Sequence, residues 1–377
     1  MTARPTILVE LGHFRPSLRA NGPNRSFVRA AAALSDRFRF RVISEAEEGD
    51  PVGVWQELDG LERIALRTGL PFAHGLRRTL RETPHDLIVC NGFFNRSLTL
   101  PTLLMKKARR IRSPILLAPR GEFSPGALGL KLARKRTYVG LLRRSGVLRG
   151  VSLQATDELE AAHLQRALRP VPVLVGPNVR PIESLPTHLI SPVGDPLRIA
   201  FLSRIDRKKN LDWAIELLSK SDFPVRFDIF GPRTLEPYWM ECQALIAKAP
   251  SNVKISYRGE VSPEAVPETL ARYDLFLLPT RGENFGHAIA DSLLAGTPVL
   301  IADTTPWLGL LHQQAGADLP LSEPNRWTAF LRRFAAMSPD ERCRWRQGAR
   351  RFAEQRLDTA GDTDRLAACF RAAMALG

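Results

Sequence analysis

The chain has 377 residues, 44% of them hydrophobic, which excludes a disordered protein and suggests two domains with cores of their own. Its cysteines (Cys90, Cys242, Cys343 and Cys369) form no Cys-x-x-Cys pair, so we expect a reducing cytoplasm and neither a disulfide framework nor a zinc site. No apolar run reaches about 18 residues, so neither a membrane span nor a signal peptide is expected, and the net charge of +15 indicates an anionic partner.

The first part of the chain alternates apolar runs with segments of helical periodicity, which predicts a parallel sheet covered by helices. Strands are expected at 6–11, 38–43, 86–90, 115–118, 152–155 and 171–175. Helices are expected at 25–35, 55–68, 73–81, 98–111 and 128–148. Thr156, Asp157 and Glu158 are expected to cap a further helix, in which Glu160 has a structural role.

The loop from Gly12 to Pro23 joins the first strand to the first helix and contains Gly22. Backbone N–H groups at the start of a helix suit a phosphate, so Gly22 is a candidate binding residue. The loop lacks a Gly-x-Gly-x-x-Gly pattern, so a dinucleotide is poorly supported, and an ordinary strand–helix connection is the alternative.

A Pro-rich stretch without periodicity, 181–196, is expected to be an interdomain linker. Beyond it, strands are expected from 198 and at 225–230, 253–257, 275–278 and 299–302, and helices up to 218 and at 236–248, 263–272, 285–295, after 323 and at 359–374. We therefore expect an α/β protein with two parallel-sheet domains, 1–180 and 197–355, a cleft between them, and a C-terminal segment 356–377.

Two acids lie near the carboxyl end of the strand 275–278, where parallel sheets bind ligands. Glu283 lies in the loop after this strand, and Asp291 lies about two turns further along the next helix. Two acids in this arrangement could hold two parts of one long ligand.

Two cations, Arg204 and Lys209, lie in the loop after the strand that begins at 198. Fixed cations can stabilise the negative charge that develops on a pyrophosphate leaving group. Arg207 and Lys208, in the same loop, are expected to be solvated.

The stretch Glu283-Asn-Phe-Gly-His-Ala-Ile-Ala-Asp291, which continues to Leu-Ala-Gly-Thr-Pro-Val, resembles the signature of retaining GT-B glycosyltransferases of family 4. That signature has two acids separated by seven residues and an aromatic–glycine pair after the first acid. The second acid is usually Glu, and Asp291 is one methylene shorter. An ordinary strand–helix unit is the alternative.

The resemblance implies a GT-B architecture, in which two Rossmann-like domains face across a cleft and the last helix returns to the N-terminal domain. It implies that Glu283 contacts the donor sugar and Asp291 the ribose. It also implies that Arg204 and Lys209 grip the donor diphosphate, although the family often has Gly where this chain has Asn210. The further donor-binding candidates are Gly22, Gly231, Asn284, Phe285, Gly286 and His287, and a packing role is the alternative for His287.

No metal or other cofactor is expected, because fixed cations would stabilise the negative charge of the diphosphate in place of a metal. The nucleotide sugar would be a co-substrate. Asp362-Thr-Asp364 has the spacing of the metal-binding pair in GT-A transferases. It lies away from any strand-end loop, so we expect it to be solvated surface.

The acceptor is expected on the N-terminal domain. Many family 4 enzymes have a His-Gly pair after the strand that corresponds to 115–118, and this chain has Arg120-Gly121. A guanidinium stays charged, so Arg120 can hold an anion but cannot act as a general base. Glu122 is the nearest carboxylate for acceptor hydroxyls, and a structural turn is the alternative for both residues.

Between Asn95 and Gly150 the chain has fourteen basic residues and one acid, so most of its net charge belongs to this segment. The helix 128–148 is basic and amphipathic, which is typical of binding to an anionic membrane surface; a core helix with a solvated basic face is the alternative. Nucleic acid is not expected, because only Phe123 and Tyr138 are interleaved with the basic residues.

The sequence therefore predicts a retaining, metal-independent glycosyltransferase that moves a sugar from a nucleotide-diphosphate sugar to a saccharide acceptor. We expect a lipid-linked acceptor, a role in cell-surface polysaccharide or glycolipid synthesis, and a cytoplasmic protein peripheral to the inner face of the cytoplasmic membrane. The leaving phosphate would help to deprotonate the acceptor on the same face. The alternatives are a GT-B-shaped nucleotide-sugar epimerase and a non-enzymatic protein that binds an anionic polymer.

Overall fold

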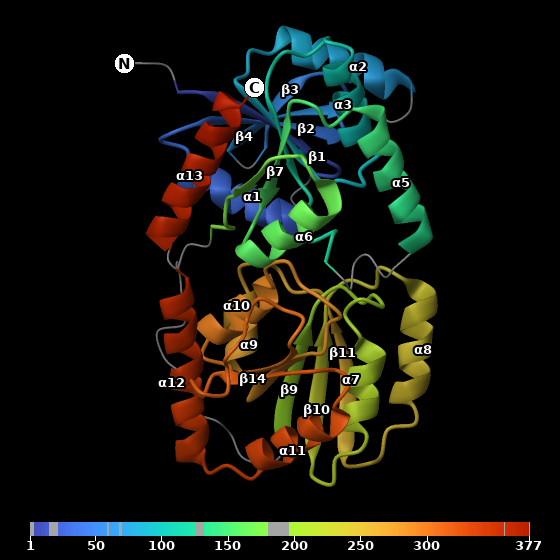
Figure 1. Cartoon of the computed structure of the whole chain (residues 1–377). Coiled ribbons are helices and arrows are strands. Elements are labelled where there is room, and N and C mark those ends of the chain that lie inside the picture. Colours follow the sequence, from blue (N-terminus) through green and yellow to red (C-terminus); the bar gives the residue numbers. More distant parts are fainter. Residues whose placement is uncertain are drawn as a thin grey trace. The chain divides into compact units, whose positions relative to one another are not determined.

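The computed structural model describes residues 4–14, 22–58, 60–67, 70–124, 132–179, 196–357 and 359–376. The chain forms two compact units. The first comprises Met1–Pro181 and Thr359–Gly377, and the second comprises Ile182–Asp358. Each unit contains its own mostly parallel sheet with helices packed on it, which confirms the predicted fold class of two parallel-sheet α/β domains (Figure 1).

The sheet of the first unit has eight strands in its described residues, in the order β3-β4-β2-β1-β5-β6-β7-β8. The strands are β1 (Thr6–Leu11), β2 (Arg39–Glu45), β3 (Trp55–Leu58), β4 (Leu61–Leu66), β5 (Leu87–Asn91), β6 (Ile115–Ala118), β7 (Val151–Ala155) and β8 (Val173–Val175). Neighbouring strands are parallel except for β3 and β4. The strand order reverses between β1 and β5, so the loops after these strands flank a switch point of the kind at which such sheets bind ligands.

The prediction of a helix at 55–68 is wrong, because this segment contains the antiparallel strands β3 and β4. β4 also pairs in parallel with β2, and its residues Ile64–Leu66 are buried. Glu62 of β4 accepts hydrogen bonds from Arg39 and Arg41 of β2 at 2.7–3.0 Å. Pairing with β2 therefore decides the conformation of a segment whose own periodicity is ambiguous.

The helices of the first unit include one from the end of the chain. In the described residues they are α1 (Gly22–Ala33), α2 (Leu70–Glu82), α3 (Thr99–Lys107), α5 (Leu132–Ser145), α6 (Glu158–Leu168) and α13 (Thr359–Ala375). The expected helix 128–148 begins outside the described residues; within them it is α5, which ends at Ser145 rather than at residue 148. α13 packs against β5, β6 and β8, and its Phe370 meets Phe38 edge to face with ring centroids 5.8 Å apart.

The sheet of the second unit has six parallel strands in its described residues, in the order β11-β10-β9-β12-β13-β14. The strands are β9 (Leu197–Leu202), β10 (Val225–Phe230), β11 (Val253–Gly259), β12 (Leu275–Leu278), β13 (Val299–Ala302) and β14 (Gly316–Leu319). β12 and β13 are buried along their whole length, as their uninterrupted apolar sequences predict. The strand order reverses between β9 and β12, so the loops after these strands flank a second switch point.

Helices alternate with strands from β9 to β13, β14 then follows β13 with no described helix between them, and two helices end the second unit. The helices of this unit are α7 (Leu211–Leu218), α8 (Glu236–Ile246), α9 (Val266–Ala271), α10 (His287–Leu294), α11 (Pro324–Ala335) and α12 (Pro339–Arg356). A capping box formed by Ser338 and Glu341 begins α12. In the part of the chain that the structure describes, no helix is both long enough and apolar enough to span a membrane.

Candidate functional site

Hydrogen bonds join the loops that follow β9, β12 and β13 at the switch point of the second unit. The amide of Arg281, after β12, donates to the carbonyl of Lys208, after β9, over 2.8 Å. The hydroxyl of Thr304, after β13, donates to the carbonyl of Thr280 over 2.8 Å. These bonds hold the three loops together at the carboxyl edge of the sheet, where a parallel sheet binds its ligand.

Lys209 and Glu283 form an ion pair between the β9 and β12 loops, with 2.5 Å between Nζ and Oε1. Their side chains are 11% and 10% exposed, so water and salt screen the two charges only weakly. The carboxylate of Asp206 accepts hydrogen bonds from the amides of Lys208 and Lys209 at 2.9 and 3.2 Å, which fixes the backbone beside the pair. The fold thus brings together two candidate residues that are 74 positions apart in the sequence.

Opposing effects set the pKa of Glu283. Burial would raise it, but the positive charges of Lys209 and Lys208 outweigh burial and hold the pKa below its usual range. Glu283 is therefore ionised at neutral pH. An ionised carboxylate accepts hydrogen bonds from several hydroxyl groups, which a sugar ring offers, but it has no proton to donate.

Lys208 is half-buried, so the expectation that it is solvated is wrong. Burial lowers its pKa and the charges of Lys209 and Arg204 lower it further, while the charge of Glu283 opposes them. The side chain of Arg204 is 53% exposed on the same loop. Nothing in the sequence distinguishes Lys208 from its neighbour Arg207, which is exposed as expected, because their burial depends on the β12 loop.

Asn210 follows Lys209 in the β9 loop and precedes α7. Its backbone is left-handed, with φ of 63° and ψ of 40°, a conformation that favours glycine and that asparagine tolerates better than most residues. Its side-chain oxygen accepts hydrogen bonds from the guanidinium of Arg281 at 3.1 and 3.3 Å. The asparagine therefore keeps the turn and adds a link to the β12 loop.

Gly231 follows β10 at a place where two loops pass each other closely. Its φ is 123°, and a Cβ atom at this position would lie 2.0 Å from the carbonyl oxygen of Ser203 in the β9 loop. Only glycine fits such an approach. This explains the residue structurally, and its contact with a donor stays a prediction.

The loop before α10 holds most of the other donor-side candidates. Gly286 precedes the helix with a left-handed φ of 78°, and Trp307 Nε1 donates to the carbonyl of Phe285 over 2.5 Å. The Phe285 ring packs against Trp307 and His287, with centroids 5.8 and 4.9 Å apart. Asn284, Phe285 and His287 are half-buried. This packing fixes the conformation of the loop at the start of α10, where backbone N–H groups suit a phosphate.

Asp291, the residue expected to bind the ribose, lies in the second turn of α10. Its side chain has no exposed surface. Contact with a ribose would therefore require a neighbouring group to move, and this role stays a prediction.

Arg120, in the first unit, follows β6 with a left-handed backbone of φ 54°. Its Nε donates to Asn91 over 2.9 Å and its Nη1 donates to Asn178 over 3.1 Å. Burial lowers the pKa of Arg120, and the charge of Glu160 opposes this effect. Side-chain amides from the last residue of β5 and from the segment after β8 thus hold the guanidinium at the carboxyl edge of the sheet, and its role in the reaction stays a prediction.

Two carboxylates stabilise the backbone near the β6 loop. Glu160 accepts hydrogen bonds from the amide of Gly121 at 2.5 Å and from the amide and hydroxyl of Thr156 at 2.8 and 2.7 Å, as expected for a structural residue. Glu122 accepts a hydrogen bond from the amide of Phe93 at 2.5 Å, and burial raises its pKa to about 7. Glu122 can therefore exchange a proton near neutral pH, as an acceptor-side residue would need to.

Gly22 is the first residue of α1, and the loop before it lies outside the described residues, so its contact with a phosphate stays a prediction. Among the residues that the structure describes, no three His, Cys, Asp or Glu side chains are grouped so that they could hold a metal ion. Asp362 and Asp364 pair with Arg365 and Arg37.

Residues 190–352 match the family model described as "Glycosyl transferases group 1". The matched segment contains the loops after β9, β12 and β13, together with the ion pair of Lys209 and Glu283. No curated protein matches the chain significantly.

Solved structures of similar fold cover nearly the whole chain. Sucrose-phosphate synthase from Thermosynechococcus elongatus has a TM-score of 0.79 at 15% identity, over 99% of this chain and 100% of that chain. Anabaena Alr3699/HepE, in complex with UDP and glucose, has a TM-score of 0.73 at 17% identity, over 97% and 99%. WaaG, a glycosyltransferase involved in lipopolysaccharide biosynthesis, has a TM-score of 0.67 at 17% identity, over 96% and 98%. The chain therefore has the GT-B fold, and its residues 190–352 resemble the glycosyl transferases group 1 family.

Proposed function

We propose that this protein is a retaining glycosyltransferase of family 4 that transfers a sugar from a nucleoside-diphosphate sugar to a saccharide acceptor. The observation that carries the proposal is the buried ion pair of Lys209 and Glu283. It lies at the switch point of the second sheet, inside the segment that resembles the glycosyl transferases group 1 family. A cation that could bind phosphate and a carboxylate that could accept hydrogen bonds from hydroxyl groups lie side by side there, which suits a sugar bonded to a diphosphate.

Three of the four cations of the β9 loop would bind the donor diphosphate, and Arg207 would not. Arg204, Lys208 and Lys209 bring positive charge to one loop, and this charge stabilises the diphosphate most when it departs. Glu283 would accept hydrogen bonds from hydroxyl groups of the donor sugar, since its lowered pKa keeps it ionised. The fixed cations would make a metal ion unnecessary.

The transfer would proceed on one face of the donor sugar. The bond between the anomeric carbon and the diphosphate oxygen breaks, and the acceptor oxygen forms a bond to the same carbon from the same side. The acceptor proton passes to the departing phosphate oxygen, so the configuration at the anomeric carbon is retained. The cations of the β9 loop stabilise the negative charge that accumulates on the leaving group.

The first test is the thermal stability of the full chain with UDP, GDP, ADP, CMP or dTDP, each with and without EDTA. A ligand that binds the folded protein stabilises it, by about 2.7 kcal/mol at a concentration a hundredfold above Kd, and therefore raises its melting temperature. We expect one diphosphate to stabilise the protein equally with and without EDTA. UDP is the first nucleotide to test, because the structure of HepE was solved in complex with UDP-glucose. Absence of any shift would contradict the proposal.

The acceptor is proposed to be a lipid-linked saccharide, in cell-surface polysaccharide or glycolipid synthesis on the inner face of the cytoplasmic membrane. Support comes from the basic segment 95–150, which would attract an anionic membrane surface at about 1 kcal/mol per basic residue near it. Product analysis separates this activity from its alternatives. Epimerised nucleotide sugar formed without an acceptor would indicate an epimerase, and polyanion binding without nucleotide binding would indicate a non-enzymatic protein.

A further inference from the structure

A hollow of about 1090 Å³ lies in the first unit, and we call it the arginine groove. Ile115, Val151 and Val171 line it, and these residues lie at or just before the starts of β6, β7 and β8. The groove is therefore at the amino edge of the sheet. Ligands of parallel sheets bind at the opposite edge, and the five residues of β7, at about 3.3 Å each, place the two edges roughly 15 Å apart. The groove is thus separate from the acceptor side proposed above.

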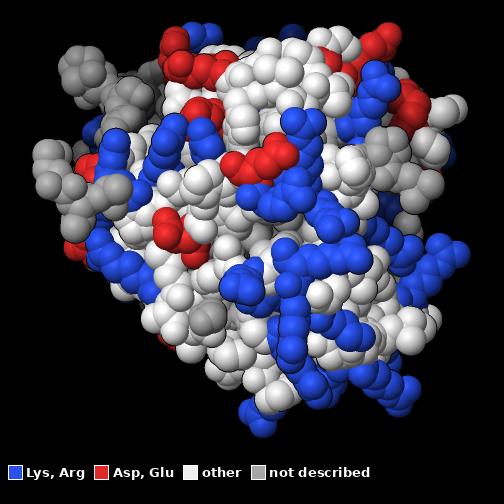
Figure 2. Space-filling model, turned by 90° about the horizontal axis from the view of Figure 1, so that it is seen from above, with Lys and Arg blue, Asp and Glu red and all other residues white. Residues whose placement is uncertain are grey.

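The arginine groove is strongly basic. The arginines that line it are Arg136, Arg143, Arg144, Arg149 and Arg169, and no Asp or Glu is among its described lining residues. The surrounding sequence is also free of negative charge, because the chain from Phe123 to Thr156 contains no Asp or Glu. Figure 2 shows Lys and Arg side chains crowded over part of one face of the molecule, with few Asp or Glu side chains among them.

None of these five arginines has an ion-pair partner among the described residues. Exposed arginines elsewhere in the chain commonly do, as when Arg207 pairs with Glu241 at 2.6 Å and Arg332 with Asp222 at 2.9 Å. Like charges gathered without counter-charges repel one another, and a bound anion relieves that repulsion. The planar fork of arginine also matches two oxygens of a phosphate.

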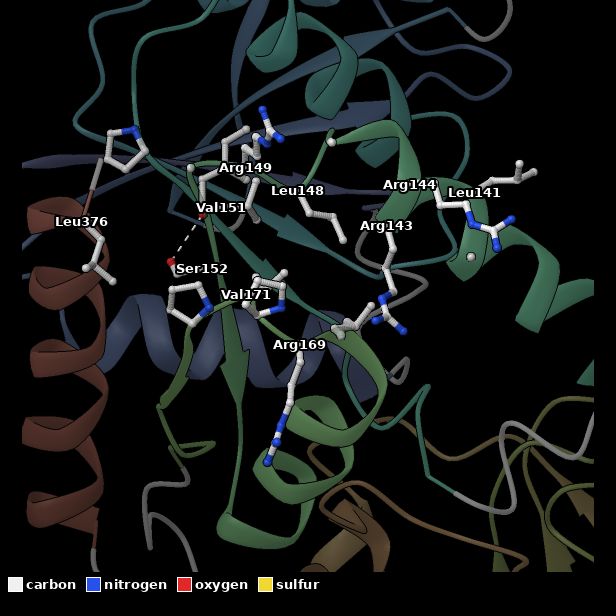
Figure 3. A pocket seen from close by; sticks show the side chains of 18 of the residues that line it. Leu141, Arg143, Arg144, Leu148, Arg149, Val151, Ser152, Arg169, Val171 and Leu376 are labelled. Carbon is white, nitrogen blue, oxygen red and sulfur yellow. Dashed lines mark hydrogen bonds between the residues drawn. The ribbon is translucent and has the colours of Figure 1, made fainter.

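Apolar side chains flank the arginines. Leu141 of α5 and Leu376, just beyond α13, are 62% and 54% exposed and line the groove. Figure 3 shows Leu376 on one side of the groove and Leu141 and Arg143 on the other, with Val151 between them. Charged heads beside exposed leucines suit a ligand that carries both phosphate and hydrocarbon.

We propose that the arginine groove binds the phosphate groups of anionic phospholipids at a membrane surface, with Leu141 and Leu376 entering the boundary of the acyl chains. This inference rests on the membrane association proposed above, and it does not depend on the transfer reaction. The proposal places the membrane contact on a surface formed by three segments that are distant in the sequence, around residues 136–152, 168–172 and 373–376. Arg169 and Leu376 belong to that surface although they lie outside the basic segment 95–150.

The test is co-sedimentation of the full chain with vesicles of phosphatidylcholine alone or with about one third phosphatidylglycerol. We expect binding only to the anionic vesicles, and a fall in the partition coefficient of at least about tenfold in the double variant Arg143→Glu/Arg144→Glu. Leu141→Ser/Leu376→Ser should weaken binding about fivefold without changing the charge. All four side chains are exposed, so unchanged melting temperatures would confirm that the variants fold.

The matched control is Lys248→Glu/Lys254→Glu, which changes the net charge equally at two exposed residues of the second unit. An equal loss of vesicle binding in this control would mean that only net charge matters and would overturn the proposal. If the protein binds a soluble anionic polysaccharide but not the anionic vesicles, the groove belongs to that polymer instead. If inorganic phosphate raises the melting temperature and the vesicles are not bound, the groove belongs to free phosphate. Nucleotide-induced thermal shifts should be unchanged in every variant, so a failure here is distinct from a failure of the transferase proposal.

Discussion

At the scale of single residues, substitution of Lys209 should weaken nucleotide binding, whereas substitution of Glu283 should not. Removing the Lys209 charge in Lys209→Ala should weaken diphosphate binding by at least about tenfold and lower kcat as well. Glu283→Gln leaves the cations unbalanced, so diphosphate binding should be unchanged or tighter, while kcat should fall by about a hundredfold or more. Calorimetry with the nucleotide and turnover measurements separate the two effects.

Arg207→Ala is the control for this pair, because Arg207 is an exposed cation on the same loop. Its binding and turnover should stay within about twofold of the parent protein. Weakened nucleotide binding in Glu283→Gln to the same degree as in Lys209→Ala would show that the pair acts only by holding the loops in place.

Glu10 of β1 makes stability depend on pH. It is fully buried, it accepts a hydrogen bond from Thr102 at 2.5 Å, and burial raises its pKa to about 7. The folded protein holds the Glu10 proton more tightly than the unfolded chain does. The stabilisation that this proton gives the folded protein is therefore complete below about pH 4.5 and is lost as the pH rises to about 7. Glu10→Gln should therefore gain stability over the parent protein between pH 5 and pH 8, by up to about 3 kcal/mol.

Melting curves at pH 5 and pH 8 check this prediction, with the exposed Glu57→Gln as the control. The difference in melting temperature between Glu10→Gln and the parent protein should grow with pH, and the control difference should not. A constant difference would contradict the inferred protonation of Glu10.

Glu283 and Lys209 could be found from the sequence, because each belongs to a pattern of residue types in a loop after an apolar strand. Lys208 could not, because its burial depends on Arg281 and Thr280, which are distant in sequence. The left-handed backbone of Asn210 could not be predicted from the sequence either, because the residue type alone indicates such a conformation only weakly.

At the scale of elements, the approach of the β9 and β10 loops depends on Gly231. Gly231→Ala should destabilise the protein by more than about 2 kcal/mol and weaken nucleotide binding, because the new Cβ would collide with the carbonyl of Ser203. Gly259→Ala is a close control, because its φ of 81° is also left-handed and nothing lies within 4 Å of the added Cβ. It should cost only about 1 kcal/mol. Equal melting temperatures in the two variants would show that the loops can separate freely.

The elements that the sequence predicted well are those that fill the centre of each sheet. β12 and β13 have apolar runs between clear turn residues, and such runs favour buried strands whatever their surroundings. β3 and β4 were missed because they lie toward one edge of the sheet, where mixed polarity resembles a helix and pairing with β2 is decisive. Local patterns therefore identify central elements better than those near an edge.

At the scale of the whole molecule, α13 completes the first unit from the far end of the chain. Its Leu366, Ala367 and Phe370 are buried in one core with residues of β1 and β2. A chain truncated after residue 358 should lose the cooperative unfolding of the first unit and keep that of the second. Phe370→Ala should lower the stability of the first unit by about 3–5 kcal/mol.

Calorimetry of the truncated chain, with and without a synthetic peptide of residues 359–377, checks this prediction. The peptide should restore the missing transition. A truncated chain that keeps both transitions would show that α13 is dispensable.

The position of α13 also has a consequence for synthesis on the ribosome. The second unit is continuous in the chain, so it can fold as soon as its last strand and helices have been made. The first unit is begun earlier but lacks α13 until residues 359–375 have been made, about 200 residues later, which takes roughly 10–40 s at 5–20 residues per second. During that interval the apolar face that α13 will cover is open to chaperones and to neighbouring nascent chains, so the half that is synthesised first is the last to become native.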